Sequence, residues 1–411
     1  MNIEKIIIVD FGGSLSQNIA SEIRKKKVYC EIFPYYNAKE NLDDYTKAVI
    51  LAGVPSEKAK NEVDSFKNLD IPTYDEIGNR EVDIEKIIEE NNFSRNWTMQ
   101  SYKDKAIEDI KNQVGDGKVL LALSGGVDSS VCASLISEAV GDRLTAIFVD
   151  TGLMRKNEGK EVEEAFKDFG MNFVYVDAED RFLEKLKGVT DPEKKRKIIG
   201  EEFIRVFEDE AKKIGHVEFL AQGTIYPDII ESGDSEDTVI KSHHNVGGLP
   251  DVIDFEGLIE PLKYLFKFED RELGRLLGLS DKLVDRQPFP GPGLSVRCIG
   301  EVRKDRLDIL RDADYIYREE IAKAGLDKNI DQYFAVLTNT LSTGNRDNKR
   351  TYDYTVALRA VETKDFMSGK AAEIPFEVLK KASKRITDEV EHVNRVVYDI
   401  TDKPPATIEW E

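Results

Sequence analysis

The chain has 411 residues, which is too many for one ordinary domain and predicts two or three. Its 59 Lys and Arg against 79 Asp and Glu give a net charge of −20, which disfavours nonspecific nucleic-acid binding because that requires a basic surface. No apolar stretch reaches the length of a membrane span. Cys30, Cys132 and Cys298 lie far apart and form no C-x-x-C pair, which fits a protein of the reducing cytoplasm. Together with the charge and the short apolar runs, this predicts a soluble protein with neither a nucleic acid nor a membrane as partner.

Residues 1–93 alternate short apolar runs with amphipathic stretches, which predicts a small α/β domain. The runs that suit strands are residues 6–9, 28–33 and 48–51. The stretches that suit helices are residues 14–27, 57–66 and 83–90. The polar residues 91–96 then suit a linker.

A second domain is predicted over residues 97–290. Its continuous apolar runs are typical of buried parallel strands, and they lie at residues 119–123, 144–149, 173–176 and 219–221. Helical patterns separate these runs, including residues 129–140, whose apolar side chains recur at i, i+4 spacing. The fold class predicted from this alternation is α/β, with a doubly wound parallel sheet.

The sequence changes character after Pro288. The run PFPGPG at residues 288–293 can form neither a helix nor a central strand. Beyond it the pattern predicts an α+β domain over residues 291–411. Its expected helices are residues 304–323 and 376–391, and its expected strands are residues 332–338, 353–361 and 395–400.

The segment VLLALSGGVDSSV, residues 119–131, predicts a phosphate-binding loop between a strand and a helix. Gly125 and Gly126 allow the backbone to approach a phosphate, and the helix that follows directs unpaired N–H groups toward it. The predicted nucleotide-binding residues are Ser124, Gly125, Gly126, Val127, Asp128, Ser129 and Ser130. Asp128 would repel a bare phosphate, so its carboxylate suits Mg²⁺. An alternative is a simple capped turn, but the whole strand–SGGVDS–helix unit favours a phosphate site.

This loop lacks the lysine of a Walker motif, and it resembles the pyrophosphate loop of the ATP pyrophosphatases. From residue 97 to the end, the chain resembles the GMP synthase family. The blocks that carry the resemblance are FVDTGLMR (148–155), KRKIIGEEFIRVF (195–207), FLAQGTIYPDIIESG (219–233), KSHHNVGGLP (241–250), RQPFPGPGL (286–294) and VNRVVYDITDKPPATIEWE (393–411). The resemblance implies ATP, Mg²⁺, XMP and ammonia as reactants, and a homodimer formed through the C-terminal domain.

The resemblance also implies roles for particular residues. Asp150 and Gly152 end the second strand, where a doubly wound sheet binds nucleotides, and they would recognise adenine and ribose. The residues that would act in catalysis are Asp228, Glu231, Lys241, His243 and His244. The residues that would bind XMP are Arg196, Gln332, Arg395, Lys403, Ile408 and Glu409. Without the resemblance, simpler interpretations remain open. Asp150 and Gly152 could form a strand-end turn, Asp228 and Glu231 an acidic turn, and the two histidines a surface pair. The basic run around Arg196 could be a solvated helix face, and the C-terminal tail could dock for stability alone.

The N-terminal domain departs from the family. Residues 6–35 and 47–56 resemble the start of a class I glutamine amidotransferase, but IPTYDEIG at residues 71–78 stands where the family has a Gly-Ile-Cys elbow, with the position of the cysteine near Ile77. No histidine precedes His216, and a glutaminase needs both a thiolate and a base. We therefore expect a truncated domain without glutaminase activity, and ammonia supplied from solution or by a separate glutaminase subunit. A second departure is the loop at residues 342–352.

These observations together predict an ammonia-dependent, AMP-forming GMP synthase of purine nucleotide biosynthesis. A tRNA-thiolating pyrophosphatase would need catalytic cysteines and a basic RNA surface, and the sequence suggests neither. A noncatalytic nucleotide-binding regulator derived from the enzyme is the alternative from a different class. It would bind XMP and ATP without releasing pyrophosphate.

Overall fold

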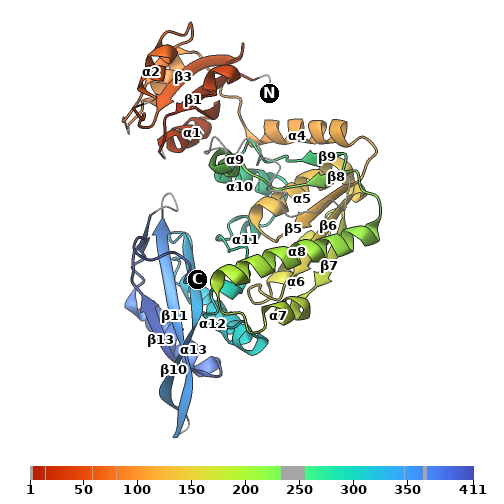
Figure 1. Cartoon of the computed structure of the whole chain (residues 1–411), viewed down its shortest axis with the longest axis vertical. Helices are drawn as coiled ribbons and strands as arrows, with labels where there is room; N and C mark the ends of the chain where they lie inside the picture. The colour runs from red at the N-terminus through yellow and green to blue at the C-terminus, as the bar shows by residue number, and fades with distance from the viewer. Residues whose placement is uncertain are drawn as a thin grey trace. The chain divides into compact units, whose positions relative to one another are not determined.

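The computed structural model describes residues 3–13, 15–57, 59–79, 81–232, 255–346, 348–363 and 368–411, with only the backbone of residues 231 and 232 (Figure 1). Its contacts divide the chain into two compact units. The first comprises Met1–Gln113, Thr224–Asn245 and Pro261–Leu277, and the second comprises Val114–Gly223, Val246–Glu260 and Gly278–Glu411. These units do not coincide with the three domains expected from the sequence, whose ranges stay a prediction.

The first unit is built on a parallel sheet in the order β2-β1-β3-β4. Its strands are β1 (Lys5–Asp10), β2 (Tyr29–Pro34), β3 (Thr46–Ala52) and β4 (Thr73–Asp75). Helices α1 (Leu15–Lys25), α2 (Lys60–Lys67) and α3 (Ile84–Glu90) join or follow these strands. The central strand β1 is buried on both faces, which explains its uninterrupted apolar run.

Three further helices belong to this unit, although they lie beyond the N-terminal segment in sequence. They are α4 (Met99–Val114), α9 (Tyr226–Ser232) and α10 (Lys267–Leu276). Tyr226 and Phe266 enter the same hydrophobic core as the isoleucines of β1 and α1. The N-terminal sheet therefore buries its apolar face against segments more than a hundred residues away in sequence.

The second unit contains a five-stranded parallel sheet in the order β7-β6-β5-β8-β9. Its strands are β5 (Val119–Leu123), β6 (Leu144–Asp150), β7 (Asn172–Asp177), β8 (Phe219–Ala221) and β9 (Gly257–Ile259). The associated helices are α5 (Val127–Val140), α6 (Glu158–Phe166), α7 (Glu179–Leu186), α8 (Pro192–Ile214) and α11 (Asp281–Val284). The chain winds outward from β5 in both directions, which confirms the predicted doubly wound α/β fold.

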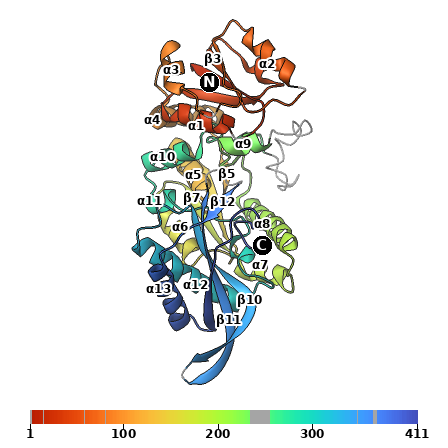
Figure 2. The same cartoon turned by 90° about the vertical axis from the view of Figure 1, so that its left-hand side faces the viewer.

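The C-terminal part of this unit is a long hairpin packed on two helices (Figure 2). Its elements are α12 (Lys304–Lys323), β10 (Gln332–Arg346), β11 (Lys349–Thr363), β12 (Gly369–Ala371), α13 (Phe376–Glu389) and β13 (Val393–Asp399). β11 pairs antiparallel with β10 and β12 and parallel with β13. The hairpin strands run further than residues 332–338 and 353–361 predicted, because the ladder continues through polar residues after a register shift between Leu337 and Leu341.

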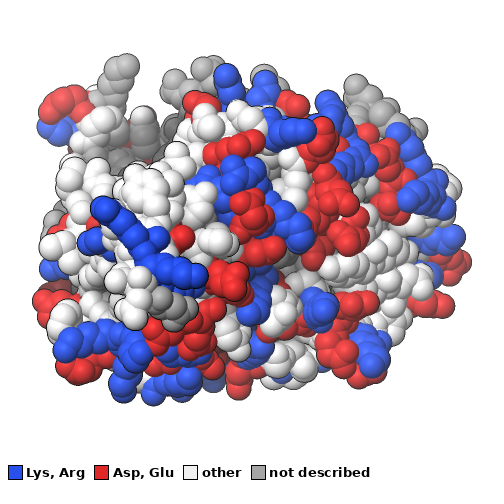
Figure 3. All heavy atoms as spheres, turned by 90° about the horizontal axis from the view of Figure 1, so that it is seen from below, with Lys and Arg blue, Asp and Glu red and all other residues white. Residues whose placement is uncertain are grey.

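A single hydrophobic core joins the five-stranded sheet to the C-terminal part, and it includes Leu120, Phe182, Leu294 and Leu358. On the molecular face in Figure 3, Lys and Arg side chains are interspersed with Asp and Glu. None of the described helices combines the length and apolar character that crossing a membrane requires.

Candidate nucleotide site

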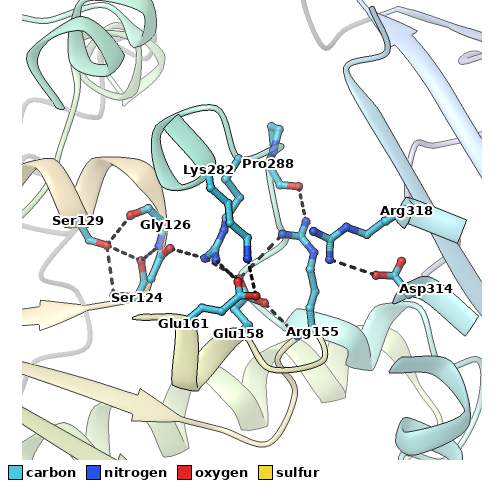
Figure 4. A network of polar contacts seen from close by, with 12 residues as sticks. Ser124, Gly126, Ser129, Arg155, Glu158, Glu161, Lys282, Pro288, Asp314 and Arg318 are labelled. Carbon is cyan, nitrogen blue, oxygen red and sulfur yellow. Dashed lines mark hydrogen bonds and ion pairs between the residues drawn. The ribbon is translucent and has the colours of Figure 1, made fainter. Parts of the chain in front are cut away.

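The predicted phosphate loop lies between β5 and α5 and is held together by its own hydroxyl groups (Figure 4). The Oγ atoms of Ser124 and Ser129 lie 3.0 Å apart. The backbone N of Gly126 donates to Ser124 Oγ at 3.3 Å, and Ser129 Oγ lies 3.2 Å from the carbonyl oxygen of Gly126. These contacts fix a tight turn directly before the N-terminus of a 14-residue helix, where an anion is favoured.

Two glycines make this turn possible. Gly125 has a φ of +76°, and a Cβ there would lie 3.1 Å from Val162 Cγ2. A Cβ on Gly223, just after β8, would lie 3.0 Å from the backbone of Asp128 and Ser129. Gly223 was not among the predicted site residues, although it lies in the block FLAQGTIY on which the family resemblance rests. Its lack of a side chain lets the end of β8 touch the first turn of α5.

The first turn of α5 carries the remaining loop residues. Val127 and Ser130 are buried, and Ser130 Oγ has no hydrogen-bond partner among the described atoms. Asp128 supplies a carboxylate in the same turn. The turn therefore offers hydroxyl and backbone N–H groups and one acidic oxygen pair, which are the groups that bind phosphate and its cation.

A partly buried network of charged side chains holds the phosphate loop through the carbonyl oxygen of Gly125. Arg286 Nη1 donates to the carbonyl oxygen of Gly125 at 2.9 Å and to Glu158 Oε1 at 2.9 Å. Glu158 Oε2 also accepts from the backbone N of Arg155 at 2.9 Å. The Arg155 guanidinium is buried 4.2 Å above the ring of Phe289, and burial lowers its pKa to about 10. Arg286 and Glu158 were not predicted, although Arg286 opens the block RQPFPGPGL.

Asp150 lies at the end of β6, as predicted, but the protein itself engages both oxygens of its carboxylate. Oδ1 accepts from the backbone N of Gly152 at 2.9 Å, and Oδ2 accepts from the hydroxyl of Tyr175 at 2.5 Å. A Cβ on Gly159 would lie 2.5 Å from Asp150 Oδ2. Asp150 thus holds the turn at the end of β6, and Gly152 has a φ of +69° within that turn.

Two of the predicted catalytic residues, Asp228 and Glu231, belong to α9. Asp228 lies in its first turn, and Asp228 Oδ2 accepts from the backbone N of Ile225 at 3.1 Å. Of Glu231 only the backbone is described, and Lys241, His243 and His244 lie outside the described residues.

The residues predicted to bind XMP are spread over α8, β10, β13 and the C-terminal tail, residues 400–411. Arg196 on α8 pairs with Glu193, Gln332 is buried at the start of β10, and Arg395 on β13 is exposed. Lys403 pairs through its backbone with Gly369, at 2.8 and 3.0 Å. These positions therefore lie on three different elements and on the C-terminal tail.

Buried arginine and lysine side chains hold the tail in place, and they were not among the predicted site residues. Arg297 forms a bidentate pair with Glu409, at 2.9 and 2.7 Å, and lies 3.8 Å from the ring centre of Phe334. Arg359 donates to the carbonyl oxygens of Thr407 and Ile408, at 2.9 Å each. Lys195 also holds the tail: its Nζ donates to the carbonyl oxygens of Ser295 and Cys298 and to the side-chain carboxylate of Glu411. The residue next to Arg196 thus anchors the last residue of the chain.

The described residues around Ile77, 71–79 and 81–83, include no cysteine or histidine. β4 ends at Asp75 and α3 begins at Ile84, so among the described residues no helix directly follows this strand, as it does in an elbow that presents a nucleophile. Cys30 is fully buried on β2, where burial raises the pKa of its thiol to about 12. A thiol with that pKa remains protonated at neutral pH and is a poor nucleophile.

The fold and the loop define a nucleotide-binding α/β protein of the ATP pyrophosphatase class. Two family models match the chain: GMP synthase C terminal domain over residues 319–410, and Arginosuccinate synthase N-terminal HUP domain over residues 118–190. Among solved structures, NMN synthetase from Francisella tularensis matches over 48% of this chain and 78% of its own, at 16% identity and with a TM-score of 0.35.

Curated relatives named GMP synthase [glutamine-hydrolyzing] match more closely. The protein from Finegoldia magna is 48% identical over 510 aligned positions, and that from Acetivibrio thermocellus is 48% identical over 511, each covering all of both chains. The protein from Treponema denticola is 66% identical over 315 residues, which are 77% of this chain and 60% of its own. The chain belongs to the GMP synthase family.

Proposed function

We propose that this protein is a ligase that forms a C–N bond, converting XMP to GMP with ATP and free ammonia. The family relationship supports the overall reaction. The observation that carries the assignment of the ATP site is the closed Ser-Gly-Gly turn before α5, whose hydroxyl and N–H groups suit a polyphosphate. A homodimer formed through residues 291–411, a cytoplasmic location and the three domain ranges are parts of the same proposal.

The reaction proceeds in two substitutions. The O2 oxygen of XMP attacks the α-phosphorus of ATP as a ring N–H of XMP loses its proton, the bond from phosphorus to the bridging oxygen breaks, and pyrophosphate leaves. Ammonia then adds to C2, the C2–O bond breaks, AMP leaves, and one proton is lost. The phosphate loop positions ATP, and Asp150 with Gly152 holds the turn where the nucleoside would bind. Positioning and charge neutralisation provide most of the rate enhancement in such a transfer.

The XMP site in this proposal combines the residues predicted from the family. Arg196, Arg395 and Lys403 supply positive charge for the phosphate, and Gln332, Ile408 and Glu409 contact the purine. Since Arg297 holds both oxygens of Glu409, that carboxylate is fixed in direction before a purine N–H reaches it. Asp228, Glu231, Lys241, His243 and His244 remain the proposed catalytic residues.

The chain's residues fit a Mg²⁺ ion that arrives with ATP. No group of three or more His, Cys, Asp or Glu side chains in the described ranges could hold a metal ion alone. Mg²⁺ at phosphate sites commonly takes one or two carboxylates and completes its shell with phosphate and water oxygens. Asp128 in the first turn of α5 supplies such a carboxylate. The ion, when bound, neutralises charge on the phosphates.

Three observations support ammonia rather than glutamine as the nitrogen donor. The alignments with the full-length relatives span 510 and 511 positions, whereas this chain has 411 residues, so the remaining positions are gaps in this chain. No histidine precedes His216 in the sequence. Cys30, the one cysteine before residue 132, is buried with a raised pKa. A glutaminase acyl-enzyme needs an accessible thiolate and a base.

The proposal is tested by incubating the purified protein with XMP, ATP and Mg²⁺ and following pyrophosphate, AMP and GMP. With ammonium we expect equal amounts of the three products. Binding of XMP and ATP without release of pyrophosphate would refute the proposal and favour a noncatalytic regulator.

A further inference from the structure

The N-terminal unit shares one hydrophobic core with two helices from the middle of the chain. Tyr226 of α9 and Phe266 before α10 are buried in it, and Ile230 and Phe268 pack against it. Both views show α1, α9 and α10 side by side (Figures 1 and 2). The truncated domain is therefore not an isolated appendage, because it supplies the surface on which α9 and α10 fold.

Arg24, in the last turn of α1, lies at the centre of this contact. Its side chain is fully buried, and Nη1 lies 3.2 and 3.1 Å from the two carboxylate oxygens of Glu269 on α10. The same Nη1 donates to the carbonyl oxygen of Tyr264 at 3.1 Å, and Nη2 donates to that of Cys30 at 2.8 Å. Burial opposes the charge, but the Glu269 carboxylate outweighs it, so the pKa of Arg24 lies above its usual value.

Four aromatic rings enclose this guanidinium. Their centres lie 4.4 to 5.8 Å from its central carbon, and they belong to Tyr29, Trp97, Tyr226 and Phe266. Cation–π contacts at these distances are strengthened when the cation is desolvated. One ring comes from β2, one from the segment just before α4, one from α9 and one from the turn before α10, so a single side chain contacts all four segments.

Glu269 and Tyr226 connect this centre to the helix termini. Glu269 Oε1 accepts from Trp97 Nε1 at 2.5 Å, and Oε2 accepts from the backbone N of Phe266 at 2.8 Å, which caps α10. The hydroxyl of Tyr226 accepts from the backbone N of Ile32 on β2 at 2.5 Å. The first residue of α9, which lies two residues before Asp228, is thus hydrogen-bonded to the N-terminal sheet.

We propose that Arg24 is a positioning residue for GMP formation, and that the truncated N-terminal domain serves the synthetase by fixing α9 and α10 through the enclosed Arg24–Glu269 pair. This proposal rests on the proposed function. Arg24 acts through α9, which carries Asp228, and a displacement of about 1 Å in such a residue can lower a rate roughly a hundredfold.

Two sets of substitutions separate positioning from stability. Arg24→Gln leaves the Glu269 carboxylate buried without its partner, so it should lower both the Tm and kcat. The double variant Arg24→Met/Glu269→Gln removes both charges, so no buried charge is left without a partner, and the Gln side chain keeps an oxygen that can accept from Trp97 Nε1 or the backbone N of Phe266. The matched control is Lys105→Ala on α4, because Lys105 forms only exposed ion pairs with Glu108 and Asp109.

We expect the double variant to regain most of the Tm lost in Arg24→Gln while its kcat with ammonium stays about tenfold or more below wild type, with the KM for ATP changed by less than about threefold. Recovery of kcat together with the Tm would overturn the proposal, because Arg24 would then only stabilise the fold. Lys105→Ala should retain wild-type kcat and Tm.

Amide hydrogen exchange tests the same proposal without turnover. In Arg24→Gln, peptides that cover residues 226–232 and 267–276 should exchange faster than in wild type, whereas those of β5 and β6 should not change. Unchanged exchange in α9 and α10 would overturn the proposal even if kcat fell. If wild type makes no GMP, the proposed function fails, and the exchange comparison still decides whether Arg24 holds these helices.

Discussion

Arg286 Nη1 donates a hydrogen bond to the carbonyl oxygen of Gly125 at 2.9 Å, across 161 residues of sequence. The same nitrogen lies 2.9 Å from Glu158 Oε1, and Arg286 Nη2 lies 3.5 Å from Glu161 Oε2. The phosphate loop is therefore fixed by a side chain that two carboxylates of α6 hold in place. Fixing the carbonyl of Gly125 leaves the neighbouring N–H groups and hydroxyls oriented before ATP binds.

Arg286→Lys should weaken ATP binding, because an ammonium group cannot span the Gly125 carbonyl and two carboxylates as the guanidinium does. We expect the KM for ATP to rise about tenfold, because the substitution removes roughly one hydrogen bond from a charged donor. Steady-state kinetics with varied ATP measures this. The control is Arg303→Lys, an exposed residue that pairs with Asp305 and Glu301. An unchanged KM in Arg286→Lys would exclude this role.

Gly223→Ala should disturb the phosphate loop from the opposite side. The added Cβ would lie 3.0 Å from backbone atoms of Asp128 and Ser129, which cannot rotate away. We expect kcat/KM for ATP to fall about tenfold or more while the protein remains folded. Gly291→Ala is the matched control, because a Cβ there meets nothing within 4 Å. Equal activities of the two variants would contradict the close approach of β8 to α5.

Arg297→Met tests the clamp on the C-terminal tail. The substitution leaves Glu409 without the partner that holds both its oxygens, and breaking such a pair typically costs about 3 kcal/mol. Urea denaturation should show this loss of unfolding free energy, and the KM for XMP should rise as well. Lys380→Met removes an exposed pair with Glu377 and should change stability by less than about 0.5 kcal/mol. A similar small change in Arg297→Met would show that the clamp does not stabilise the tail.

Asp399 gives the stability a defined pH dependence. Burial raises the pKa of its carboxyl, but hydrogen bonds from Thr401 and the charge of Arg359 outweigh that effect, so the pKa lies below the usual 3.8. Since the folded pKa is depressed, the stabilisation is present above pH 3.8 and is lost as the pH falls through the folded value.

Asp399→Asn should therefore lower the free energy of unfolding at pH 7, by about 1 to 3 kcal/mol because the buried Arg359 loses its carboxylate. The difference from wild type should shrink as the pH falls below 3.8. Denaturant titrations across this range measure it. Asp388→Asn, at an exposed pair with Lys384, serves as the control. A difference between Asp399→Asn and wild type that is independent of pH would argue against the assignment.

The sequence predicted the elements whose signals are local. The apolar runs 119–123 and 219–221 coincide with β5 and β8, because buried parallel strands are apolar on both faces. The SGGVDS turn likewise combined strand, glycine and helix signals within a few residues. Local patterns could not assign α9 and α10 to the N-terminal unit, because that depends on contacts such as Arg24 with Glu269, 245 residues apart.

The same limit applies to the candidate site. Arg286 and Gly223 lie in blocks that carry the family resemblance, but only the fold shows that they touch the phosphate loop. The engagement of Asp150 by Tyr175 and of Glu409 by Arg297 likewise depends on tertiary contacts. The sequence suggested single residues by their chemical type, and their partners became visible only in the fold.

The central claim is that this protein aminates XMP with free ammonia and does not use glutamine. The most direct measurement supplies XMP, ATP and Mg²⁺ with either ¹⁵N-ammonium or glutamine labelled with ¹⁵N in its amide, and follows the label into GMP by mass spectrometry. We predict labelled GMP and an equal amount of AMP with ammonium, and no labelled GMP with glutamine. Label transferred from glutamine by the purified chain would contradict the account.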